Sequence, residues 1–141
     1  MAISSQGVRT TNVTSSQAAW ELRTGSASKP KILEVDLIQT ATTASSYGFG
    51  RPAAAGITPV NTLFQMDDPG DPASICNVSL SWGTSPTAPN IYMRRWNSNN
   101  VIGVGVIWTF PRGLAVPISS SMVIFNITTT VACDVNCILD E

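Results

Sequence analysis

The stretch that decides the fold is VIGVGVIWTFPRGLAVPISSSMVIFNITTTVACDVNCILDE, residues 101–141. Three apolar runs are separated here by short segments rich in Pro, Gly, Ser and Thr, a pattern typical of consecutive antiparallel strands. In the last run Val131, Cys133, Val135, Cys137 and Leu139 recur at every second position, so an extended backbone directs all five to one face. The positions between them are mostly polar. The sequence therefore predicts that this run is a half-buried strand of a sheet.

Two further features of this stretch are interpreted as structural. Phe110-Pro111-Arg112-Gly113-Leu114 is expected to be a tight turn between strands, with Arg112 exposed. Cys133 and Cys137 lie roughly 13 Å apart on an extended strand, whereas a disulfide needs Cα atoms within about 7 Å. Both thiols are expected to fill the core, and the odd count of three cysteines favours free thiols.

The alternation continues upstream in shorter runs. Strand-like segments occupy residues 17–24, 31–39, 47–51, 62–66, 76–82 and 91–96. The first two are expected to pair as antiparallel neighbours across a short loop, with Leu33, Val35 and Leu37 facing the core. No segment shows a helical period. About eight short antiparallel strands in one chain of this length predict an all-β fold, a single-domain β-sandwich of jelly-roll-like form.

The first 16 residues differ from the rest, because they are polar and show no period. They are expected to form an extended N-terminal arm, either disordered or ordered only against a neighbouring subunit. The β-sandwich domain is accordingly assigned to residues 17–141.

Composition excludes several classes of function. Charged residues make up 12% of the chain, the net charge is −1 and there is no His. A chain without a basic excess lacks the footprint for nucleic acid, and no apolar run is long enough to span a membrane. The N-terminus has no apolar signal core, which favours synthesis and retention in the cytoplasm. A surface with so few charges favours burial against copies of the same chain or within a larger assembly.

The chain offers no recognisable catalytic centre or cofactor site. Without His, the commonest general base and metal ligand are missing, and the carboxylates are scattered. The one acidic cluster, Asp67, Asp68 and Asp71, lacks the spacing of a calcium loop and is interpreted as an exposed Asx-Pro turn. We expect no enzyme activity, no metal and no cofactor.

The best candidates for contact residues are Trp20, Arg94, Arg95 and Trp96, because Trp and Arg are enriched at protein interfaces. The arginine pair is expected to meet acidic residues of a neighbouring subunit. A second interpretation is a carbohydrate- or receptor-binding module of a tail fibre or adhesin, in which an aromatic ring stacks on a sugar. Its candidates are Tyr47, Trp82, Tyr92 and Trp96.

Four runs carry a resemblance to a known family. GFGRPAAAGITPV, DDPGDPAS, GVIWTFPRGLAVP and CDVNCILDE resemble segments of head decoration (cement) proteins of tailed bacteriophages, over nearly the whole chain from Trp20 to Glu141. The resemblance implies a β-rich fold, a homotrimer on the capsid surface of the virion, and stabilisation of the shell by bridging major capsid protein subunits. It implies no catalytic residue.

Overall fold

The computed structural model describes residues 2–27, 29–128 and 131–141. These residues form eleven strands and no helix, and so contain no helical segment able to cross a membrane. The strands are β1 (Ile3–Arg9), β2 (Gln17–Arg23), β3 (Lys31–Gln39), β4 (Ser46–Gly50), β5 (Ile57–Leu63), β6 (Gln65–Met66), β7 (Asn77–Thr84), β8 (Arg94–Asn97), β9 (Gly105–Ala115), β10 (Ser121–Asn126) and β11 (Cys133–Asp140).

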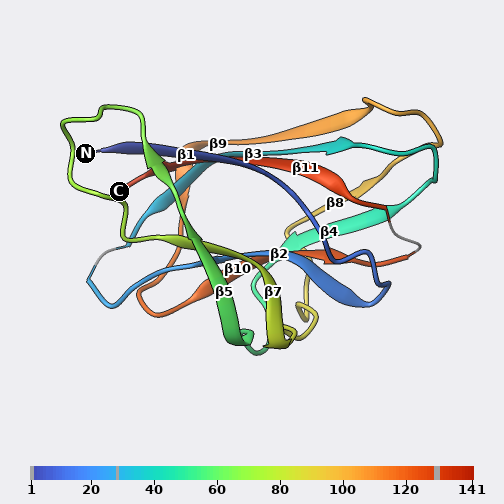
Figure 1. Ribbon diagram of the computed structural model, residues 1–141, viewed down its shortest axis with the longest axis horizontal. Coiled ribbons are helices and arrows are strands. Elements are labelled where there is room, and N and C mark those ends of the chain that lie inside the picture. Colours follow the sequence, from blue (N-terminus) through green and yellow to red (C-terminus); the bar gives the residue numbers. More distant parts are fainter. Residues whose placement is uncertain (1, 28, 129–130) are drawn as a thin grey trace.

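The strands build two antiparallel sheets that pack face to face (Figure 1). The first sheet, here sheet A, has the order β6-β1-β11-β3-β9, and the second, sheet B, has the order β5-β7-β2-β10-β4-β8. When β5, β6 and β7 are left aside, the order of sheet A is β1-β11-β3-β9 and that of sheet B is β2-β10-β4-β8. In this arrangement the chain changes sheet after every strand except between β4 and β8. Eight strands connected in this way form a jelly roll, so the predicted fold class is confirmed.

The three additional strands are an insertion between β4 and β8. In the insertion, β7 extends sheet B beside β2, and β5 pairs with β7. Between β5 and β7 the chain crosses to sheet A, where β6 pairs with two residues of β1. The insertion therefore lies along one edge of the sandwich, while β8 and β9 form the opposite edge.

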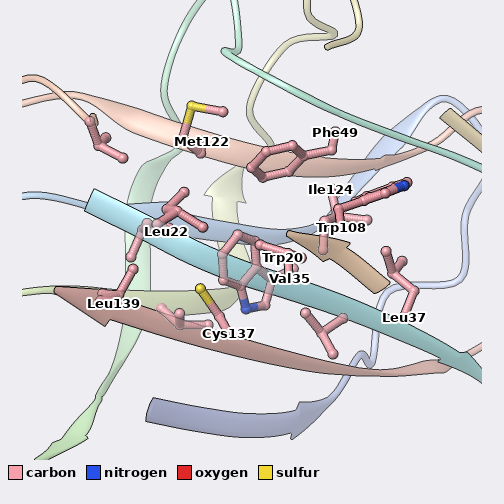
Figure 2. Packing of buried hydrophobic residues seen from close by; sticks show 14 of the residues in the cluster. Trp20, Leu22, Val35, Leu37, Phe49, Trp108, Met122, Ile124, Cys137 and Leu139 are labelled. Atoms are coloured by element: carbon pink, nitrogen blue, oxygen red, sulfur yellow. The ribbon is translucent and has the colours of Figure 1, made fainter. Parts of the chain in front are cut away.

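The core lies between the two sheets and receives side chains from both (Figure 2). Trp20 and Leu22 of β2 lie at its centre, facing Val35 of β3 and Cys137 of β11. In β11 every second residue is buried, from Cys133 to Leu139. The predicted alternation of the last strand is thus confirmed, and the thiols of Cys133 and Cys137 fill the core.

The pairing of successive strands differs from the expected hairpins. β2 lies in sheet B and β3 in sheet A, so they are not neighbours. β9, β10 and β11 likewise alternate between the sheets, although all three are antiparallel to their actual partners. Alternation along a strand shows which face is buried, but it does not show which partner completes the sheet.

The expectation of an N-terminal arm outside the sandwich is corrected. Within residues 1–16, Ile3–Arg9 is strand β1, and it pairs with β11 in continuous register from Ile3↔Asp140 to Arg9↔Asp134. Backbone hydrogen bonds between Ala2 and Glu141 extend the pairing, so the two termini lie together (Figure 1). β1 contains small and polar residues and has only one strongly buried position, Ser4, which is why its hydrophobic pattern is weak.

Two irregularities also correct the sequence analysis. The segment 110–114 is not a turn between strands but lies within β9, where Gly113 has a positive φ of 69° and the register to β3 shifts. In β3 the residue opposite Leu139 is Ile32, while Glu34 lies opposite Ile138, which makes Leu33 the extra residue of a bulge. Ile32 is therefore buried in place of Leu33.

Candidate interaction surface

Trp20 is the one predicted contact residue that the fold removes from the surface. Its side chain is fully buried in the middle of the core (Figure 2). It therefore has no exposed surface to offer a partner, and its assignment as an interface residue is corrected. A single Trp on an alternating strand fits a core and an interface equally well, so the sequence pattern did not separate the two.

Arg94, Arg95 and Trp96 lie together on β8, the edge strand of sheet B. Arg94 and Arg95 are exposed and Trp96 is half-buried. The Trp96 ring stacks on Tyr47 of β4, with ring centroids 5.8 Å apart and an interplanar angle of 18°. Trp96 therefore covers the margin of the core, and the two arginines remain available to a partner.

Each arginine rests on an aromatic ring. The guanidinium carbon of Arg94 lies 5.4 Å from the centroid of Phe110 on β9, and that of Arg95 lies 5.7 Å from the centroid of Tyr92. Burial raises the pKa of Tyr92, and the positive charge of Arg95 opposes this rise. Both contacts are cation–π in kind, and the first one joins the edge of sheet B to the edge of sheet A.

Neither arginine has an acidic partner among the residues that the structure describes. The ion pairs found there are Arg9 with Asp134 on the outer face of sheet A, and Arg23 with Glu21 in sheet B. Arg51 lies beside this edge, where it donates to the carbonyl of Ala115 at the end of β9. Lys31, paired in register with Ala115, and Arg112 are also exposed there.

We call this region, β8 and β9 with the flanking Lys31 and Arg51, the basic edge. It also carries aliphatic side chains that are exposed to solvent. Ile107 of β9 and Ile102 of the preceding loop each expose more than 60% of their surface. Ile38, Ile91 and Val101 are further exposed aliphatic residues on or beside it. Exposed aliphatic residues next to unpaired cations are typical of a protein contact surface.

The opposite edge of the sandwich, formed by β5, β6 and the loop after β6, has the opposite charge. We call it the acidic edge, because Asp67, Asp68 and Asp71 lie in its loop. Ile57, Val60 and Leu63 of β5 are exposed to about 60% each. Together the two edges hold eight of the eleven large aliphatic residues found exposed within the described ranges.

The aspartates of the acidic edge serve as turn formers. Asp68 Oδ1 accepts a hydrogen bond from the Gly70 amide at 2.8 Å, and Asp67 Oδ1 accepts one from the Ser5 hydroxyl at 2.7 Å. No group of three metal-ligating side chains occurs in residues 2–27, 29–128 and 131–141. The loop therefore presents its carboxylates separately, as charges on a surface.

Two shallow grooves of similar size lie apart from the basic edge. One of about 570 Å³ runs between β1, β11 and the end of β5, and Gln6 and Leu63 line it. The other, of about 550 Å³, is lined by Tyr92, Phe125 and hydroxyl-bearing residues of the segment 84–87. Of the four aromatic residues considered for sugar stacking, Tyr92 is the one that lines this groove, whereas Tyr47 is buried.

Trp82 has a different role, which the sequence pattern did not reveal. Its indole Nε1 donates to Glu21 Oε2 at 2.7 Å, and the Gly56 amide donates to Glu21 Oε1 at 3.1 Å. Arg23 donates to the same carboxylate and to the carbonyl of Gly56. Glu21 is fully buried and satisfied, and it holds the segment before β5 against sheet B.

The three cysteines are free, buried and unsuited to nucleophilic chemistry. Burial raises the pKa of the Cys76 thiol to about 12 and that of Cys133 to about 11. Burial also raises the pKa of Cys137. Because a thiolate is the reactive form, all three remain inert near neutral pH.

Comparisons with models of protein families, with curated proteins and with solved structures found no match for this chain.

Proposed function

We propose that this protein is a structural virion protein that decorates a bacteriophage capsid. In this role it binds the outer surface of the head as a homotrimer and bridges subunits of the major capsid protein. The observation that carries the proposal is the concentration of exposed aliphatic and unpaired charged residues on two opposite edges of the sandwich. A protein with two contact surfaces is able to make several contacts at once, and multivalent attachment gives avidity without a strong single site.

Further support comes from the rest of the molecule, which offers no reactive group among the residues that the structure describes. The chain carries few charges, its cysteines are inert core residues, and its buried carboxylate Glu21 is fully occupied by structural hydrogen bonds. The jelly roll is a recurrent architecture of viral capsid proteins and of lectins, so the fold permits the role without specifying it. The sequence resemblance to decoration proteins favours the capsid.

The test is reconstitution on heads of the encoding phage from which this protein has been removed. We expect the purified protein to rebind at a fixed ratio to the major capsid protein and to raise the temperature at which the heads release their DNA. Sedimentation with quantitative gel analysis measures the ratio, and dye access to DNA during heating measures release. Absence of saturable binding to these heads would refute the proposal.

A second candidate function is recognition of a carbohydrate or receptor by a tail fibre or adhesin. The groove beside Tyr92 and Phe125 favours it, because an aromatic ring next to hydroxyl groups is the usual setting for a bound sugar. Selective binding on a glycan array, lost in Tyr92→Ala, would support this function. A flat array together with saturable binding to heads would favour decoration.

A further inference from the structure

We infer that copies of this protein associate head to tail, with the basic edge of one copy docking on the acidic edge of the next. The inference deepens the proposed function and rests on it for the setting in which copies meet. Both contact surfaces belong to the isolated protein.

The two edges are complementary in charge. Arg94, Arg112 and Lys31 are exposed on the basic edge, and Asp67 and Asp68 are exposed on the acidic edge. Within one chain these groups are too far apart to pair. The outer strands of sheet A, β6 and β9, are separated by four strand spacings, or roughly 19 Å at about 4.8 Å each. That distance exceeds the Debye length of about 8 Å at physiological salt, so the charges of one edge hardly interact with those of the other within the monomer.

The two edges are also alike in having apolar surface to bury. Ile107 and Ile102 are exposed on the basic edge, and Val60 and Leu63 are exposed on the acidic edge. β9 and β5 are the outermost strands of their sheets, and their outer backbone groups have no neighbouring strand. Unprotected edges of this kind favour contact with another chain.

A groove beside the acidic edge offers room for a side chain of the next copy. It has a volume of about 570 Å³, and Gln6, Leu63 and Gln65 are among the residues that line it. Gln6 Nε2 donates to the Leu63 carbonyl at 3.0 Å, and this hydrogen bond joins β1 to the end of β5 at the groove.

These observations indicate that the partner of each edge is a second copy of this chain, bound in one orientation. One chain carries both members of the complementary pair, and each member is exposed. A two-fold contact of basic edge against basic edge would place unpaired arginines opposite one another, which is unfavourable. Head-to-tail contacts between identical chains form a ring when the rotation closes, and otherwise a filament.

The experiment is charge reversal on the two edges of the full chain, read by light scattering after size exclusion and by sedimentation velocity. We expect the unaltered protein to be larger than the 14.9 kDa monomer. Arg94→Glu with Arg112→Glu should shift it to the monomer, and so should Asp67→Lys with Asp68→Lys. The chain that carries all four substitutions should associate again, because both edges are reversed. Glu34→Lys on β3, the inner strand beside β9, is the control for a charge change outside the reversed pairs and should leave the mass unchanged.

Three results would overturn the inference. The first is that the unaltered protein is monomeric at high concentration. The second is that the oligomer persists in both charge-reversed variants. The third is that the variant with all four substitutions folds but stays monomeric. Melting curves and circular dichroism of each variant separate loss of contact from loss of fold. If the edges prove correct but the protein does not bind heads, the contact between copies stands and the capsid proposal fails.

Discussion

The guanidinium of Arg94 on β8 lies 5.4 Å from the ring centroid of Phe110 on β9, and this contact joins the edge strand of one sheet to the edge strand of the other. Phe110 in turn lies 6.0 Å from Phe49, measured between ring centroids, so the cation rests on the margin of the core. The residue that presents charge to a partner is thus held by the packing of the sandwich.

Replacing Arg94 should have a small effect on stability and a large effect on assembly. An exposed cation–π contact contributes about 0.5–1 kcal/mol, so Arg94→Ala should lower the free energy of unfolding by no more than that. Chemical denaturation measures the loss, and a double-mutant cycle with Phe110→Leu isolates the coupling. Heads reconstituted with Arg94→Ala/Arg95→Ala should show reduced occupancy. Full occupancy and full heat resistance would show that these arginines are not contact residues.

Removing the first strand should unfold the protein. β1 pairs with β11 along its whole length and separates it from β6, so deletion of residues 1–9 exposes the edge of a central strand. We expect the deleted chain to lose its cooperative melting transition, measured by circular dichroism. Val13→Ser, in the loop after β1, is the control and should melt like the unaltered protein. A deleted chain that still melts cooperatively would show that β1 is dispensable.

Glu21 should be the most sensitive charged residue. Glu21→Ala leaves the Trp82 indole and the Gly56 amide without an acceptor, and each buried donor without a partner costs about 1–3 kcal/mol. Urea unfolding should show that the free energy of unfolding falls by this amount or more. Trp82 fluorescence should shift to the red as the indole becomes exposed to water. Glu34→Gln, half-buried on the outer face of β3, is the matched control with little expected effect. Equal losses for both variants would contradict the structural role of Glu21.

Stability should fall at alkaline pH because of the buried thiols. The pKa of Cys76 is raised by burial from 9.0 to about 12 and that of Cys133 to about 11, so the folded protein holds these protons more tightly than the unfolded chain. The stabilisation is complete below about pH 9 and is lost as the pH rises from 9 through 11 to 12. Tyr47, whose pKa is also raised by burial, adds to the loss above its ordinary value of 10.0.

Urea unfolding at a series of pH values checks this prediction. The Cys76→Ala variant should show a smaller decline over the alkaline range than the unaltered protein, even though the cavity lowers its stability at neutral pH. A stability that is independent of pH above 9 would contradict the assigned burial of the thiols.

Some of this fold was predictable because strand alternation is a local property. The two-residue period in 133–139 and in the run ending at Trp82 arises from the backbone geometry of each strand alone. It identified the buried face of β11 and, with the turn residues, the all-β jelly-roll class. Leu33 departs from this local pattern, because a bulge in the pairing of β3 with β11 places Ile32 in the core instead.

The candidate surface was predictable in part. Arg94, Arg95 and Trp96 were recognisable from residue type, and two of them are exposed on an edge strand. Trp20 has the same chemical character but lies in the core, because β2 is an inner strand of sheet B. The contribution of Phe110, Lys31 and Arg51 to the basic edge depends on strands far apart in the sequence, and no local pattern reports such proximity.

The sequence by itself determined that most segments of this protein are strands, with β1 the exception, which face of the last strand is apolar, and that the chain carries few charges. Only the tertiary structure decided which strands are neighbours, which sheet each one joins and which edges remain open. The physical reason is that burial along a strand follows from the alternation of its own side chains, whereas pairing depends on backbone hydrogen bonds between distant segments that all strands offer alike. The polar strand β1 illustrates this, because its side chains show no strand pattern in the sequence, yet its backbone pairs with β11 along its whole length and the Arg9–Asp134 ion pair supports that pairing.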